Sequence, residues 1–103
     1  MNIRPVEIEY KKHIGSLNGR PVIEIATKGG YHLVCAPKGN TVEYLGAGPH
    51  RAVARFIAKK RAPDIKITDL AKADHVDPEF FDHLLPMYEQ MTDRFNAAEV
   101  TRK

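Results

Sequence analysis

The chain has 103 residues, a formal net charge of +3 and a single cysteine, Cys35. This length fits one domain, residues 1–103, with a modest core, and one cysteine excludes a disulfide framework within the chain. The first residues, MNIRPVEIEYKK, have no apolar leader, and no apolar run approaches ~20 residues, so we expect a cytoplasmic protein without membrane contact.

Short runs of β-branched and aromatic residues fill the first half of the chain, separated by dipeptides that tolerate positive φ. Such dipeptides favour tight hairpins between antiparallel neighbours. In the run VIEIAT, Ile23 and Ile25 can share one face. Ile14-Gly15 indicates a bulge or the end of the first strand. We predict a four-stranded antiparallel meander within residues 5–46, with strands at 5–15, 21–28, 31–37 and 41–46.

After the fourth strand the hydrophobic period becomes that of a helix. Pro49 suits a first helical turn and Pro63 ends the pattern. Residues 64–67 form a connector that can be extended. Pro86 lies inside the last apolar stripe, where it should kink or divide a helix. The predicted fold is α+β, in which the meander is followed by a basic helix at 49–61 and a C-terminal helical hairpin at 68–74 and 78–98.

Charge is unevenly distributed along the chain. Residues 1–66 carry 12 Lys and Arg against 5 Asp and Glu, whereas residues 67–103 carry 4 against 8. The two halves either neutralise each other or create a surface with a preferred partner. Helical spacing predicts that several cations of helix 49–61 share an exposed edge, either as a solvated face or as contacts to successive phosphates. These candidate nucleic-acid-binding residues are Arg51, Arg55, Lys59, Lys60 and Arg61.

The segment GAGPHRAVARFIA, residues 46–58, locally resembles the junction between the last strand and second helix of double-stranded-RNA-binding domains. In that family a G-x-G strand end leads into a basic helix that meets RNA phosphates. The resemblance implies phosphate-facing roles for Arg51 and Arg55. It covers 13 residues, and the predicted order ββββα departs from the family's αβββα.

Residues 70–84 have a spacing similar to a helix-turn-helix, with Ala71 in the first helix and Val76 after the turn. The second helix would present Glu79, Asp82 and His83. Carboxylates are repelled by DNA phosphates, so base recognition is not favoured. We interpret the segment as a helical hairpin used for packing.

Five histidines are spread along the chain, and no pair has the i, i+4 spacing of a helical metal site. Cys35 is predicted in mid-strand among apolar residues, with His32 on the opposite face, so no thiolate base is at hand. No catalytic, phosphate-loop or dinucleotide motif is present. We therefore expect neither an enzyme nor a bound metal or cofactor. The histidines are His13, His32, His50, His75 and His83.

Two functional hypotheses remain. The first is a small non-enzymatic binding or regulatory protein that contacts nucleic-acid phosphates through the basic helix, with added charge from Lys11, Lys12, Lys28 and Lys38. The second is a protein-interaction module, a small adaptor or inhibitor, that uses the C-terminal helices or a sheet edge. In that case the apolar stripe of residues 78–98 packs on the domain's own sheet or forms a homodimer. Pairing of the basic stripe with acidic residues would weigh against the first hypothesis.

Overall fold

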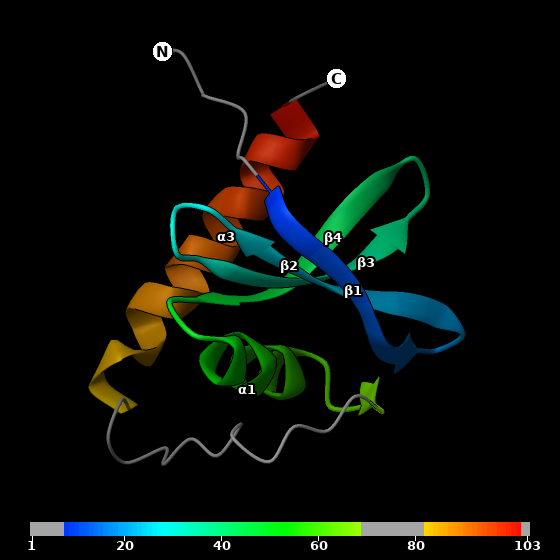
Figure 1. The fold of residues 1–103 in the computed structure, drawn as a ribbon, viewed down its shortest axis with the longest axis horizontal. Coiled ribbons are helices and arrows are strands. Elements are labelled where there is room, and N and C mark those ends of the chain that lie inside the picture. The colour runs from blue at the N-terminus through cyan, green and yellow to red at the C-terminus, as the bar shows by residue number, and fades with distance from the viewer. Residues whose placement is uncertain (1–7, 69–81, 102–103) are drawn as a thin grey trace.

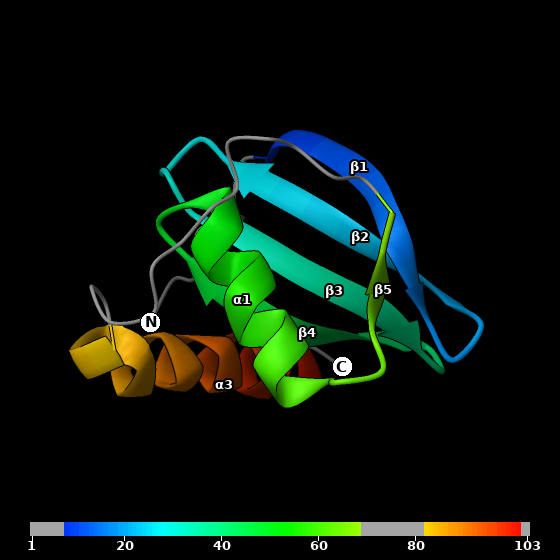
Figure 2. The same cartoon turned by 90° about the horizontal axis from the view of Figure 1, so that it is seen from below.

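The computed structural model describes residues 8–68 and 82–101. An antiparallel sheet forms the centre of the molecule. One helix lies across one face of the sheet, and a second helix runs beside the fourth strand, which forms one edge of the sheet (Figures 1 and 2). The strands occur in the spatial order β4-β3-β2-β1-β5. Their bounds are β1 Ile8–Leu17, β2 Arg20–Thr27, β3 His32–Lys38, β4 Thr41–Gly48 and β5 Lys66–Ile67.

The predicted meander is confirmed, with boundaries within two residues wherever the structure describes them; the start of the first strand, residues 5–7, lies outside the described residues. The first turn has φ of +50° at Asn18 and +82° at Gly19, the pair of positive values that a two-residue hairpin needs. A shift of register between His13 and Gly15 is the predicted bulge, and β1 continues beyond it. The fifth strand, which extends the predicted sheet, pairs Lys66 with Ser16 and Ile67 with Gly15.

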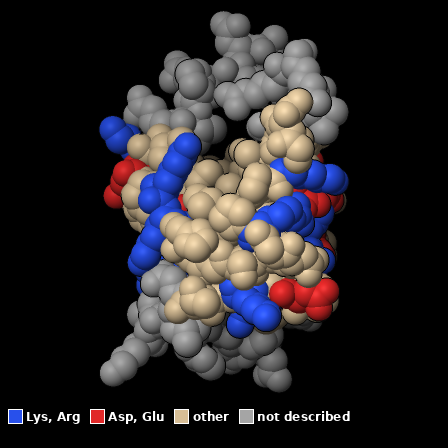
Figure 3. Space-filling view, turned by 90° about the vertical axis from the view of Figure 1, so that its right-hand side faces the viewer, with Lys and Arg blue, Asp and Glu red and all other residues tan. Residues whose placement is uncertain are grey.

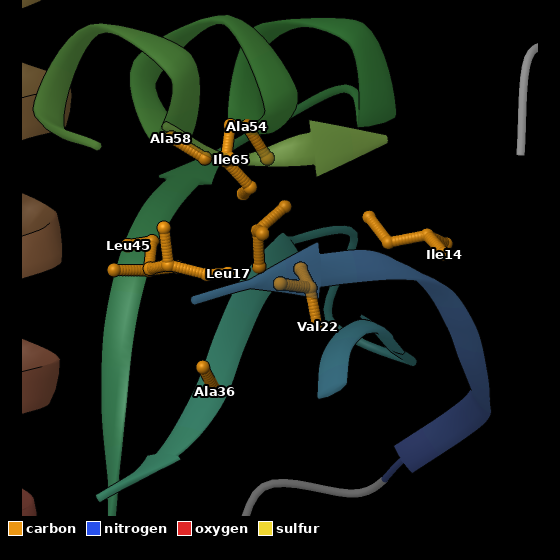
Figure 4. Packing of buried hydrophobic residues seen from close by; sticks show 9 residues of the cluster. Ile14, Leu17, Val22, Ala36, Leu45, Ala54, Ala58 and Ile65 are labelled. Carbon is orange, nitrogen blue, oxygen red and sulfur yellow. The ribbon is translucent and has the colours of Figure 1, made fainter. Parts of the chain in front are cut away.

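Helix α1, Arg51–Arg61, covers the sheet face to which Val22 and Val34 point. It begins two residues after Pro49, with His50 as its N-cap, so the predicted start was early. Two residues that α1 turns toward the sheet, Ala54 and Ala58, are small, which lets the helix approach closely. Figure 4 shows this main core, composed of Ile14, Leu17, Val22, Val34, Ala36, Leu45, Ala54, Ala58 and Ile65.

Helix α3, Leu85–Thr101, follows a single 3-10 turn, η1 Asp82–Leu84. Pro86 therefore stands in the first turn of α3, where a proline is tolerated. Of the two predicted effects, a kink or a division, the described residues show a division, because the 3-10 turn ends and the α-helix begins beside Pro86. The predicted helix 68–74 and the start of the helix 78–98 lie outside the described residues. A second core joins α1 to α3 through Val53, Ile57, Leu85 and Tyr88.

The outer edge of β4 is held by α3 through one amide side chain. Asn96 Oδ1 accepts a hydrogen bond from the Tyr44 backbone N–H at 2.6 Å, and Asn96 Nδ2 donates to the Tyr44 carbonyl at 2.9 Å. The ring of Phe95 lies 5.4 Å from that of Tyr44, centroid to centroid. Leu85, Tyr88 and Met91 of α3 thus pack within the molecule, whereas Met87 on the same helix is 49% exposed. Among the described residues, no helix is long and apolar enough to cross a membrane.

Candidate functional site

The basic stripe of α1 does not form one exposed row. Arg55 is only 6% exposed and points between the helix and the sheet, where its Nε lies 2.8 Å from Glu24 Oε2. The prediction that Arg55 shares an exposed edge with Arg51 and Lys59 was wrong. Arg55 turns inward because the buried carboxylate of Glu24 on the sheet needs a nearby cation, which α1 supplies.

Two further cations of the stripe are paired with acidic residues of α3. Lys60 Nζ lies 3.7 Å from Glu89 Oε2, and Arg61 Nη2 donates to Asp93 Oδ1 at 2.7 Å. Lys59 is exposed and Arg51 is half-buried. The acidic second half of the chain thus neutralises part of the basic first half, which weighs against a continuous phosphate-binding edge on α1. Phosphate binding by these residues stays a prediction.

A polar network lies around Glu24 on β2, whose side chain is completely buried. The Tyr10 hydroxyl on β1 donates to Glu24 Oε1 at 3.1 Å, while Arg55 donates to the other carboxylate oxygen. Both oxygens of the carboxylate therefore have donors, as a buried anion requires. Burial raises the pKa of the Tyr10 phenol, and the negative charge of Glu24 adds to this shift, with Arg51 and Arg55 opposing it.

This raised pKa predicts how Tyr10 contributes to stability at alkaline pH. Because the pKa in the folded state exceeds the usual value of about 10, the contribution of the neutral phenol is complete below that pH and is lost as pH rises through the folded pKa. We expect the difference in unfolding free energy between the parent and Tyr10→Phe to stay constant from about pH 7 to 9 and to shrink above pH 10. Urea unfolding across this range measures it. An unchanged difference at higher pH would contradict the prediction.

The four histidines that the structure describes belong to four different elements: His13 to β1, His32 to β3, His50 to the N-cap of α1 and His83 to η1. His75 lies outside the described residues. Within residues 8–68 and 82–101, no group of three or more His, Cys, Asp or Glu side chains could hold a metal ion. Cys35 is buried in β3, as the strand pattern predicted.

The other face of the sheet carries a groove that α1 does not cover. The side chains of Val34 and Ala36 enter the core under α1, so Leu33 and Cys35 point to the opposite face. Cross-strand pairing places Ile23 beside Cys35 there. We call this surface the sheet groove; its volume is about 410 Å³. It is lined by Lys11, Lys12, His13, Pro21, Ile23, Ile25, Cys35, Ala36, Pro37 and Val42.

The charges of the sheet groove are all at one end. Lys11, Lys12 and His13 are consecutive exposed residues of β1, and the lining contains no Asp or Glu. Toward β4 the lining is apolar and ends at Val42. Figure 3 shows the side of the molecule that faces right in Figure 1, with uncharged surface in the middle and both basic and acidic side chains along its two sides.

Sequence reasoning did not identify the sheet groove as a candidate site. It correctly predicted that Ile23 and Ile25 share a face, but this face points away from α1. The available signal was the apolar character of both faces of the second and third strands, of which one helix can cover only one. On that face Ile23 and Ile25 are half-buried and Cys35 is buried, so its apolar surface is only partly exposed.

No protein-family model matches the chain, and neither a curated protein nor a solved structure matches it. A proposal about its function therefore rests on the contacts and charges described above.

Proposed function

We propose that this chain is a small non-enzymatic binding protein that holds a segment of a partner protein in the sheet groove. The observation that carries the proposal is the apolar floor formed by Ile23, Ile25 and Cys35 on a sheet face that α1 leaves uncovered. Burying this floor under side chains of the partner would contribute roughly 25 cal/mol to the free energy of binding for each Å² of apolar surface removed from water. The entropic cost of association is subtracted from this contribution.

A nucleic-acid ligand is less well supported by this groove. Its lining contains no Phe, Tyr or Trp, so it offers no surface on which bases could stack. The basic stripe of α1 is also interrupted by the buried Arg55 and by the ion pairs of Lys60 and Arg61. These contacts favour the protein-interaction hypothesis over phosphate binding.

Catalysis in the groove is not favoured either. The lining includes a thiol, Cys35, and an imidazole, His13, but Ile23 lies between them in the cross-strand register. Two strand spacings separate them by roughly 10 Å, which is too far for a histidine to take the thiol proton directly. A binding role uses the residues present without requiring such a pair.

Photo-crosslinking in cells tests the proposal. A benzophenone amino acid would replace Pro37, which is exposed in the groove lining, and in a control protein Lys59, which is exposed on α1. Circular dichroism would establish that both proteins fold. We expect adducts of one defined mass at position 37 that contain a partner polypeptide, and none of that mass at position 59.

The result that would overturn the proposal is a lack of protein adducts at position 37, or the same adducts at both positions. Adducts at position 59 that disappear on nuclease treatment would instead favour nucleic-acid binding by α1. An adduct of twice the chain mass, composed only of this sequence, would identify the partner as a second copy.

A further inference from the structure

The sheet groove runs across the strands and changes character along its length. Its cationic end is on β1, its floor lies over β2 and β3, and its far end reaches Val42 on β4. Cross-strand register aligns His13, Ile23, Cys35 and Tyr44 in one row across β1, β2, β3 and β4. A ligand that fills the groove therefore meets positive charge first and apolar side chains afterwards.

The size of the groove limits the ligand to a few residues. Three strand spacings separate β1 from β4, a distance of roughly 14 Å. An extended peptide covers this distance with about four or five residues at roughly 3.3 Å each. Its alternate side chains point the same way, so apolar residues at positions i and i+2 would both face the floor. At about 410 Å³ the groove accepts a few side chains, toward the lower end of known ligand pockets.

The charge of the rim selects the chemistry of that segment. Lys11 and His13 are exposed on β1, and their cross-strand partners on β2 are Ile25 and Ile23, which carry no charge. We infer that the sheet groove takes an extended, acidic-apolar segment of a partner protein, with a carboxylate at the β1 rim and alternating apolar residues over the floor. This inference rests on the proposed binding function and adds the identity of the ligand class.

A substitution at Glu9 tests the inference independently of folding, because it should strengthen binding, whereas loss of folding could only weaken it. It is exposed on β1 at the irregularity between Ile8 and Tyr10, two residues before Lys11, so at most roughly 7 Å of chain separates the two Cα atoms. Its negative charge lies within a Debye length of an acidic ligand bound at that rim, so it repels the ligand and weakens binding. Replacing Glu9 with lysine should therefore strengthen binding of an acidic segment.

The experiment is a selection of displayed random octapeptides on the full chain at low salt, followed by fluorescence anisotropy with the enriched peptides. We expect the enriched sequences to combine Asp or Glu with apolar residues two positions apart. Lys11→Glu should weaken their binding by about tenfold, and Glu9→Lys should tighten it by about threefold. Lys59→Glu, an equal charge reversal at an exposed position of α1, should leave the affinity unchanged.

Either of two results overturns the inference. One is enrichment of apolar or basic peptides whose affinity does not respond to Lys11→Glu, Glu9→Lys or salt. The other is the absence of any enriched peptide. Both are distinguishable from failure of the proposed function, because crosslinking of a partner protein at position 37 would still show that the groove binds protein of another chemistry.

Discussion

Replacing Arg55 with alanine is expected to lower the free energy of unfolding by about 3–5 kcal/mol. The guanidinium is the cation that faces Glu24 at 2.8 Å inside the protein, and its removal leaves that carboxylate buried without its charge partner. Such an uncompensated buried charge costs far more than the net contribution of an intact ion pair. Urea unfolding followed by circular dichroism would measure the loss as a lower midpoint with an unchanged slope.

Two controls separate this effect from a general sensitivity of α1. Lys59→Ala removes a cation at an exposed position one turn along the helix and should change stability by no more than about 0.5 kcal/mol. The double variant Glu24→Gln/Arg55→Met removes both charges together and should recover a large part of the loss. Equal losses for Arg55→Ala and Lys59→Ala would show that Arg55 acts as an ordinary surface cation.

Gly46→Ala is expected to cost about 3 kcal/mol, the upper end of the range for an overpacked core. A Cβ at Gly46 would overlap the carbonyl oxygen of Ala54, and it would lie 2.8 Å from the backbone nitrogen of Ala58. These neighbours are helix backbone, so a side-chain rotation cannot relieve the overlap. Helix α1 would have to move away from β4, which would loosen the packing of Ala54 and Ala58 against the sheet.

Gly29→Ala is the matched control because it makes the same chemical change in the turn between β2 and β3. An added Cβ there meets nothing closer than 3.8 Å, and the residue is exposed. It should be neutral or slightly stabilising, since alanine reduces the freedom of the unfolded chain. If Gly46→Ala unfolded at the same urea concentration as Gly29→Ala, the close contact between α1 and β4 would not limit stability.

The strands were predictable because the turns between them have strict backbone requirements. Asn18, Gly19, Gly30 and Gly39 all have positive φ, which few other residues adopt, and such residues fix where a hairpin reverses. The two-residue strand β5 has no such local signal. Lys66 and Ile67 become a strand because the chain leaving α1 reaches the edge of β1 at Gly15 and Ser16.

The orientation of α1 was harder to predict because strands β2 and β3 are apolar on both faces. In β2, Val22 and Ala26 face α1, while Ile23 and Ile25 face the sheet groove, so alternation alone does not say which face the helix covers. Glu24 lies among the residues that face α1. A single acidic residue on the face of a strand that a helix covers indicates that a basic residue of the helix turns inward to pair with it. The sequence alone does not show that the basic residue is Arg55, because this requires knowing that α1 packs on the Glu24 face of the sheet.

The contact between Asn96 and Tyr44 bears on how this protein would unfold locally and aggregate. A side-chain amide that bonds both backbone groups of one residue occupies the place of a neighbouring strand, and it belongs to a helix far away in the sequence. If α3 detached by local unfolding, β4 would present unpaired backbone groups on an edge beside apolar surface. Aggregation of partly unfolded molecules would then begin at β4, and the lifetime of the native protein would depend on how firmly α3 is held.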